Sequence, residues 1–252
     1  MRGAGSGAGA SAWARYRMLS GEHRQERVVV RLVVAGAGGI LVAALAGVWT
    51  GLATAAGLFG AHAIYLRNRP GRATSWRQGA LAERRTGRRL AGLDPAAFHV
   101  MHDRVLPDTP TVNLDHLVIG LTGVYTIASR RWTWGVRIWA DHRRVWAGRR
   151  PLIGLHATAA HAAKTVAEVF ADELDQIVHV SPVISVHGAR LPRGGLKHGG
   201  VTFQPVRRLA RFIDAQPVIF TGAEVAALAA AAERILPPML TEGAYRYRVA
   251  RQ

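Results

Sequence analysis

A long uncharged segment near the N-terminus constrains this chain more than any other feature. From Leu32 to Leu66 the sequence contains no Asp, Glu, Lys or Arg, and its only histidine is His62. A membrane-crossing helix needs about 20 apolar residues, with a range of about 17–25, so the segment is too long for one upright span. It is long enough for two short ones. The sequence therefore predicts a transmembrane helical hairpin at residues 32–66.

The composition of the segment favours a hairpin over other membrane arrangements. Residues 47–51 (GVWTG) are the natural turn, because two glycines relax the backbone and Trp49 suits a membrane interface. Small residues recur at helical spacing and would let two helices pack closely: Gly36, Gly39, Ala43 and Gly47. A signal peptide has a shorter apolar core, of about 7–15 residues. A single tilted span followed by an interfacial segment is the alternative.

Arginines on both sides of the segment predict its orientation. Three precede it and four follow it closely: Arg24, Arg27, Arg31, Arg67, Arg69, Arg72 and Arg77. Positive flanks mark the cytoplasmic side of a membrane. We therefore expect a multi-pass protein of the cell membrane with both termini and its soluble domain in the cytoplasm. Residues 1–31, which open with a Gly/Ala/Ser tract, are expected to form a flexible basic tail, and residues 239–252 a C-terminal tail.

Residues 72–238 are expected to form one soluble α/β domain with a mixed sheet. Helical and strand-like patterns alternate along this segment, as they do in α/β folds. Residues 221–224 (TGAE) have the form of a capping box, which predicts the start of the last helix. The expected helices are 76–93, 153–174, 206–213 and one from Thr221 to the prolines at 237–238. The expected strands are 98–103, 114–120, 124–128, 135–140, 144–147, 177–186, 201–204 and 217–220.

Charge and composition limit the functions open to this domain. The chain has 33 Lys+Arg against 16 Asp+Glu, so its field should attract the phosphates of nucleic acid or anionic lipid. It has no cysteine, which excludes disulfides, a thiolate nucleophile and a Cys-based zinc site. It also lacks a phosphate loop with GK(S/T) and a G-x-S-x-G elbow, so no nucleotide cofactor is expected.

Three sequence features stand in the order expected of a metal-dependent phosphodiesterase. Residues 79–83 (GALAE) place Glu83 on a helix, residues 114–116 (LDH) place Asp115 on a strand, and residues 123–130 (GVYTIASR) form the next strand. These motifs resemble the nuclease-related domain family NERD, whose pattern is a Glu-bearing helix, an IDH strand and a GVFVID(S/T)K strand. Residues 186–192 (VHGARLP) also resemble actinobacterial members of the family.

The resemblance implies a restriction-endonuclease-like core similar to the PD-(D/E)xK nucleases, in which neighbouring strands present carboxylates and a lysine to Mg²⁺ or Mn²⁺. By motif position Glu83 and Asp115 would be the metal ligands. Ala128 stands where a second acid belongs, and Arg130 stands where the lysine belongs. Alanine cannot bind a metal, and arginine has no accessible route to proton transfer. The motif therefore leaves cleavage open but disfavoured.

Two functions follow. The first is a catalytically degenerate, membrane-anchored domain that binds nucleic acid or a protein partner, with Arg130, Arg131 and Trp132 as nucleic-acid contacts. The second is an active Mg²⁺- or Mn²⁺-dependent nuclease of DNA or RNA that uses Glu83, Asp115 and Arg130. A displaced carboxylate would have to complete its metal site, and the candidates are Asp103, Asp108 and Asp141.

Each functional residue also has a structural interpretation. Glu83 could be an ion-pair partner of the arginines around it on a helix surface. Four tryptophans could stack on single-stranded bases between arginines, or could cover the sheet: Trp132, Trp134, Trp139 and Trp146. The histidines His116, His156 and His161 lack the spacing of a metal site and are expected to be structural.

Overall fold

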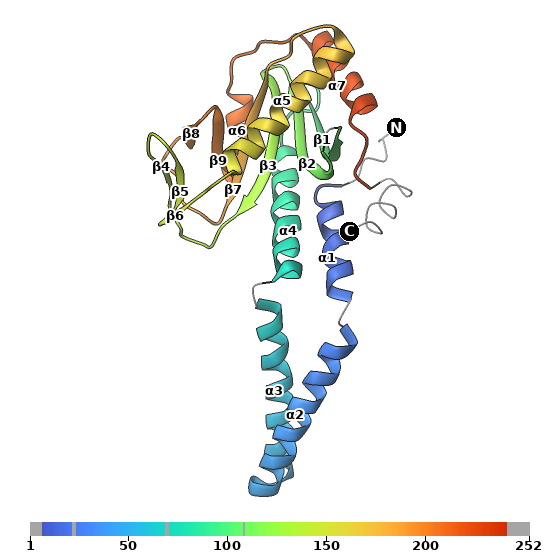
Figure 1. The fold of residues 1–252 in the computed structure, drawn as a ribbon, viewed down its shortest axis with the longest axis vertical. Coiled ribbons are helices and arrows are strands. Elements are labelled where there is room, and N and C mark those ends of the chain that lie inside the picture. The colour runs from blue at the N-terminus through green and yellow to red at the C-terminus, as the bar shows by residue number, and fades with distance from the viewer. Residues whose placement is uncertain (1–6, 22–23, 69–70, 108, 241–252) are drawn as a thin grey trace. The chain divides into compact units, whose positions relative to one another are not determined.

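The computed structural model in Figure 1 describes residues 7–21, 24–68, 71–107 and 109–240. The chain divides into two compact units. The helical unit comprises Ala12–Gln78, and the α/β unit comprises Met1–Ser11 together with Gly79–Gln252. The predicted C-terminal tail at residues 239–252 lies almost entirely outside the described residues.

Two helices of the helical unit pack closely through small residues. They are α2 (Arg24–Ala46) and α3 (Val48–Asn68), separated only by Gly47, whose φ is 93°. A Cβ on Gly51 would stand 2.6 Å from the carbonyl oxygen of Gly39 and 2.5 Å from the Cβ of Ala43. The close packing expected at Gly39 and Ala43 is thus present, because no side chain separates the backbones there. The turn is shorter than predicted, since residues 48–51 already belong to α3.

One described helix, α2, is long and apolar enough to cross a membrane. Its stretch Val28–Ala46 has a mean hydropathy of 2.4. Helix α3 is not a candidate span by the same measure of length and composition, among the residues that the structure describes. The hairpin of two spans therefore stays a prediction.

The N-terminal segment differs from the expected flexible tail, because helix α1 spans Ala10–Gly21. Its first two residues, Ala10 and Ser11, belong to the α/β unit. The Ser11 backbone N–H donates to Asp103 Oδ2 at 2.8 Å, and the Ser11 hydroxyl donates to Asp103 Oδ1 at 2.5 Å. Alanine-rich sequence favours the helix, and these buried hydrogen bonds hold its start.

A six-stranded mixed sheet forms the centre of the α/β unit. Its strand order is β1 (Phe98–Leu106), β2 (Thr109–Gly120), β3 (Gly123–Arg131), β7 (Val180–His187), β9 (Val201–Pro205) and β8 (Leu196–His198). The first three strands pair antiparallel, β3–β7 and β7–β9 pair parallel, and β8 returns antiparallel to β9. A small second sheet contains β4 (Ile138–Ala140), β5 (Val145–Ala147) and β6 (Arg150–Pro151). The predicted α/β class with a mixed sheet is confirmed.

Helices cover both faces of the main sheet. On one face, α5 (Leu155–Leu174) and α7 (Gly222–Ile235) bury Phe170 and Leu228 against β2 and β3. Figure 1 shows α5 crossing this face. On the other face, the end of α4 (Arg72–Leu90) and the short helix α6 (Leu209–Asp214) pack on Val118 and Ile127, and the 3-10 turn η1 (Val206–Arg208) leads into α6. Alternate residues of β2 and β3 therefore enter different layers.

The start of α7 and the loop before it were both predicted from the sequence. The capping box at the start of α7 is confirmed, because Thr221 and Glu224 bond reciprocally. The strand predicted at residues 217–220 is wrong. The amides of Ile219 and Phe220 both donate to the carbonyl oxygen of Leu121, which closes a loop against the β2–β3 turn rather than extending the sheet.

Candidate functional site

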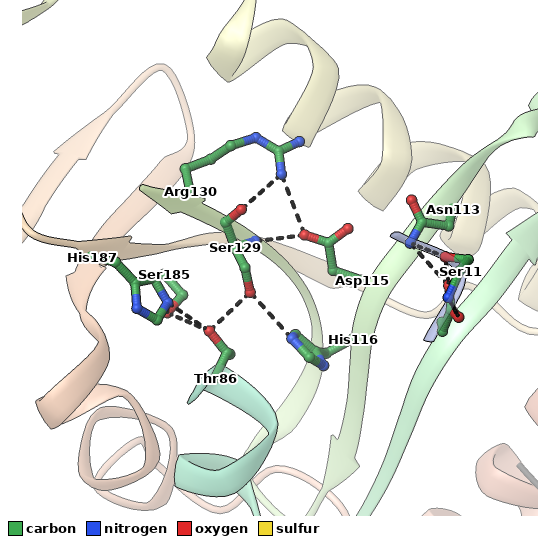
Figure 2. Close-up of polar contacts among 10 residues, drawn as sticks. Ser11, Thr86, Asn113, Asp115, His116, Ser129, Arg130, Ser185 and His187 are labelled. Atoms are coloured by element: carbon green, nitrogen blue, oxygen red, sulfur yellow. Dashed lines mark hydrogen bonds and ion pairs between the residues drawn. The ribbon is translucent and has the colours of Figure 1, made fainter. Parts of the chain in front are cut away.

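Asp115 and Arg130 meet on neighbouring strands (Figure 2). Asp115 lies in the middle of β2 and Arg130 near the end of β3. Asp115 Oδ2 accepts a hydrogen bond from the Ser129 backbone N–H at 2.7 Å and lies 3.3 Å from Arg130 Nη1. The same Nη1 donates to the Ser129 carbonyl oxygen at 2.9 Å. One carboxylate oxygen of Asp115 is thus occupied by protein donors.

Burial and the arginine act in opposite directions on Asp115. Burial raises the pKa of the Asp115 carboxyl, whereas the Arg130 charge and the Ser129 N–H lower it and the charge of Asp103 raises it further. The net result is a raised pKa. Arg130 therefore compensates only part of the cost of a buried carboxylate.

Ala128 lies beside this pair. The β2–β3 register pairs His116 with Ile127, so Asp115 and Ala128 are the next residues along their strands. Asp115, Ala128 and Arg130 line a cavity of about 390 Å³ under α5. Most of the other lining residues are apolar, including Leu114, Leu155 and Ala162. The position that would carry the second acid therefore offers a methyl group to the cavity.

Glu83 is buried on α4 and does not line that cavity. Its side chain is 6% exposed, and its Oε2 has no hydrogen-bond partner among the described residues. Burial, followed by the charges of Asp115 and Asp103, raises the pKa of Glu83 well above its usual value, while Arg130 lowers it. The alternative interpretation of Glu83 as an ion-pair partner on the helix surface is therefore wrong, because its side chain is buried.

The three candidate displaced acids have different positions. Asp103 is buried in β1 with a φ of 53°, and its carboxylate accepts from Ser11 and from Asn113 Nδ2 at 3.0 Å. Asp141 accepts from the N–H groups of Arg143 and Arg144 and from Trp146 Nε1, so it shapes the β4–β5 turn, and these bonds lower its pKa to about 2. Asp108 lies outside the described residues.

The donors present do not make a metal cage. Among the residues that the structure describes, no three His, Asp or Glu side chains are grouped so that they could hold a metal ion. The Asp115 oxygen nearest Arg130 already has two donors, and Ala128 supplies none. Mg²⁺ prefers carboxylate and water oxygens in octahedral geometry, so this set fits the implied ion poorly.

A buried polar chain under the site was missed by the sequence analysis. It runs from His102 through His116, Ser129 and Thr86 to His187 (Figure 2 labels the last four). The successive distances are 2.8 Å, 3.2 Å, 2.8 Å and 2.9 Å. Ser185 also lies 3.0 Å from the Thr86 hydroxyl. The chain joins β1, β2, β3, α4 and β7, and the only sequence signal was polar residues inside otherwise apolar strands.

The three histidines of this buried polar chain, His102, His116 and His187, are neutral at pH 7. Burial is the largest cause in each case, and it lowers the pKa of His102, lowers that of His116 well below its usual value and lowers that of His187 to about 4. The Ser129 hydroxyl donates to the Thr86 hydroxyl. If every other hydrogen bond in the chain has its donor on the His102 side and its acceptor on the His187 side, neutral rings satisfy all of the contacts. The expectation that His116 is structural agrees with this arrangement.

The three residues predicted to contact nucleic acid separate onto two faces. Arg130 lines the Asp115 cavity, whereas Arg131 and Trp132 line a different hollow beside His187. Adjacent residues on a strand point to opposite sides of its sheet, which explains the division between Arg130 and Arg131. Trp139 and Trp146 stack on each other at 5.6 Å on the small sheet, and Trp134 is exposed.

Comparison with known proteins bears on the α/β unit. Residues 78–187 match the family model of NERD, the nuclease-related domain. The matched segment includes Glu83, Asp115, Ala128 and Arg130. No curated protein and no solved structure matches the chain.

Proposed function

We propose that this chain is a membrane-anchored, nuclease-related protein whose domain binds nucleic acid without cleaving it. The carrying observation is the site on the inner strands β2 and β3, where Arg130 pairs with Asp115 and Ala128 supplies no ligand. In a PD-(D/E)xK-like core this position would need a second carboxylate to hold the ion. The guanidinium of Arg130 instead pairs with Asp115, so an ion pair stands where an active site would hold the metal, and the basic balance of the chain still favours a phosphate-bearing ligand.

The membrane part of the proposal draws on the helical unit. Large apolar side chains of α2 are exposed in the structure, among them Val33, Ile40, Leu41 and Leu45. Exposing these apolar side chains to water is unfavourable, and the acyl chains of a membrane would cover them. A hairpin of α2 and α3 with both ends in the cytoplasm places the domain where nucleic acid can reach it.

A specific observation favours a second candidate, an active nuclease with a rearranged metal site. Glu83 Oε2 is buried without a partner, and the charges of Asp115 and Asp103 reach it. An unpaired buried carboxylate is costly, so a cation would stabilise it. Cleavage in Mg²⁺ or Mn²⁺ would identify this alternative.

A cleavage assay separates the two candidates. The full chain in detergent is incubated with plasmid, single-stranded DNA and RNA in Mg²⁺ or Mn²⁺, beside Asp115→Ala as the control for contaminating nuclease. The full chain is needed because Ser11 bonds to Asp103 and belongs to the α/β unit. We expect binding that weakens with salt and no cleavage above the level of the control. Cleavage that disappears in Asp115→Ala would overturn the degenerate site.

A gain-of-function variant tests the reason for inactivity. Ala128→Glu with Arg130→Lys restores the acid and lysine of the motif, and the cavity beside Ala128 leaves room for the longer side chain. We expect this double variant to cleave in Mn²⁺ and Arg130→Lys alone to remain inactive, because lysine without the second acid still leaves the ion short of ligands.

A further inference from the structure

A groove of arginines and tryptophans lies on the α4 face of the domain, away from Ala128 and its cavity. One hollow of about 260 Å³ is lined by Arg85, Arg131, Arg207, Trp132 and Trp134, with His187 and short stretches of β7 and β9. A second hollow of about 440 Å³ is lined by Arg85, Arg88, Arg89 and Val206. The two share Arg85 and Val206, so they form one continuous surface, here called the arginine–tryptophan groove.

The charge of the groove is uncompensated. Among the described residues, no Asp or Glu lines either hollow. In the part of the chain that the structure describes, no salt bridge involves Arg85, Arg88, Arg89, Arg131 or Arg207. Arg85, Arg131 and His187 line the same hollow, and the two arginine charges lower the pKa of His187 after the larger effect of burial. Several unpaired guanidinium groups along one groove attract a chain of phosphates.

The aromatic side chains indicate which polyanion the groove accepts. Trp134 is 82% exposed at the rim of the first hollow, and the Arg190 guanidinium lies over its ring at 5.8 Å from the centroid. An exposed indole can stack on an unpaired base, whereas the bases of a duplex are stacked on one another and closed to it. Tryptophan also suits a lipid headgroup surface, so anionic lipid is the competing ligand in the test.

The backbone holds this platform in place before any ligand binds. The Trp132 N–H donates to the His187 carbonyl oxygen at 2.9 Å, and the Gly135 N–H donates to the Gly188 carbonyl oxygen at 3.0 Å. The Arg190 N–H donates to the Val136 carbonyl oxygen at 2.7 Å. Residues 132–136 are therefore fixed along the end of β7, and little ordering remains to oppose binding.

We propose that the arginine–tryptophan groove is a binding site for single-stranded nucleic acid, with the arginines on phosphates and Trp134 on a base. The groove site rests on the proposed function, since it names the face of the domain that nucleic acid contacts. It is separate from the Asp115–Arg130 cavity, which α5 covers on the opposite face of the sheet.

Fluorescence anisotropy with the full chain in detergent tests the site. The probes are a labelled dT20 strand and a labelled 20-base-pair duplex, each titrated over a series of salt concentrations. We expect dT20 to bind more tightly than the duplex. Trp134→Ala should weaken dT20 binding roughly 5- to 150-fold, and Trp134→Phe should retain most of it because a ring remains. Arg131→Gln should lower the salt slope for dT20 by about 0.7.

Matched controls and competitors decide between outcomes. Arg149→Gln removes an exposed arginine that lines neither hollow and should leave the dT20 affinity within about twofold, the change expected of a minor surface charge. Equal binding of strand and duplex, with no effect of Trp134→Ala, would overturn the groove site but leave nucleic-acid binding in place. Displacement of dT20 by phosphatidylglycerol bicelles, with Trp134→Ala neutral, would assign the arginines to lipid and also overturn it. Failure of both probes at low salt would remove the proposed function as well.

Discussion

Arg130 lies against Asp115, with Nη1 of the guanidinium 3.3 Å from Oδ2 of the carboxylate. The arginine also donates to the carbonyl oxygen of Ser129, whose N–H bonds to the same carboxylate oxygen. Asp115 and Arg130 therefore each bond to the main chain of Ser129 in β3 as well as to each other. Such an arrangement neutralises a buried acid within the protein, where a catalytic carboxylate would keep its oxygens available for an ion.

Removing this cation should make stability depend on pH. In Arg130→Met the pKa of Asp115, already raised by burial, rises further because the largest compensating charge is gone. A carboxyl whose folded pKa lies above its unfolded value loses stability as pH rises past the unfolded value. We expect Arg130→Met to be less stable than the wild type by about 1 kcal/mol at pH 7, after allowance for the exposure of Arg130, and equal to it near pH 3.5.

Thermal unfolding of the full chain, followed by tryptophan fluorescence across this pH range, measures the difference. Arg149→Met is the matched control, since Arg149 is exposed in a turn of the small sheet. A loss that is equally large at pH 3.5 and pH 7 would show that the arginine acts through packing and not through the charge of Asp115.

Glu83 differs from Asp115 because the Oε2 atom of its buried carboxyl has no hydrogen-bond partner among the described residues. Its pKa is raised well above the usual value, so the folded state holds the proton over a range in which the unfolded state has released it. Stability is then lost as pH rises from about 4.5 through the folded pKa. We expect Glu83→Gln to unfold at a higher temperature than the wild type at pH 7 and at the same temperature near pH 4.

The surface variant Glu168→Gln, whose partner is Lys164 one helical turn away, controls for loss of a negative charge. A stabilising shift by Mg²⁺ in the wild type that is absent from Glu83→Gln would contradict this account of Glu83. It would instead place a bound cation at the carboxylate.

The elements that carry the site could be predicted from sequence, but their contacts could not. Strand-like runs on either side of the Thr122–Gly123 turn predicted β2 and β3, and period-two geometry alone separates Arg130 from Arg131. Two partners of Thr86, Ser185 and His187, lie 99 and 101 residues away in the chain, and no local pattern carries that information. Residues 217–220 were mistaken for a strand because an apolar, β-branched run has the composition of one whether or not a partner strand exists.

Thr86 joins two halves of the buried polar chain, so its hydroxyl should be important for stability. It accepts from Ser129 at 2.8 Å and lies 2.9 Å from His187 Nε2. Thr86→Val keeps the shape and leaves both groups without that partner, which should cost about 1–3 kcal/mol. Thr86→Ser keeps the hydroxyl and should lose less than half as much, about the value of one methyl group. Urea unfolding of the full chain in detergent compares them, and a loss in Thr86→Ser at least as large as that in Thr86→Val would contradict the importance of the hydroxyl, because only Thr86→Ser removes the methyl.

Gly188 lines the arginine–tryptophan groove and has a left-handed backbone conformation that residues with a Cβ rarely adopt. Its φ is 81°, and a Cβ there would stand 2.4 Å from the carbonyl oxygen of Trp132. The obstacle is backbone rather than a mobile side chain, so Gly188→Ala must either strain residue 188 or push residues 132–136 away from β7. We expect a loss of about 1–3 kcal/mol in stability.

The same substitution should weaken dT20 binding. The amides of Trp132 and Gly135, which hold residues 132–136 in place, donate to the carbonyl oxygens of His187 and Gly188, and a shift at residue 188 would disturb both hydrogen bonds. Gly194→Ala is the matched control, since a Cβ at Gly194 meets nothing within 4 Å. Unfolding and anisotropy measured on one preparation separate the two effects. Reduced stability with unchanged dT20 affinity would mean that the strand contacts the arginines without needing the 132–136 segment in place, and the stacking role of Trp134 would then be lost.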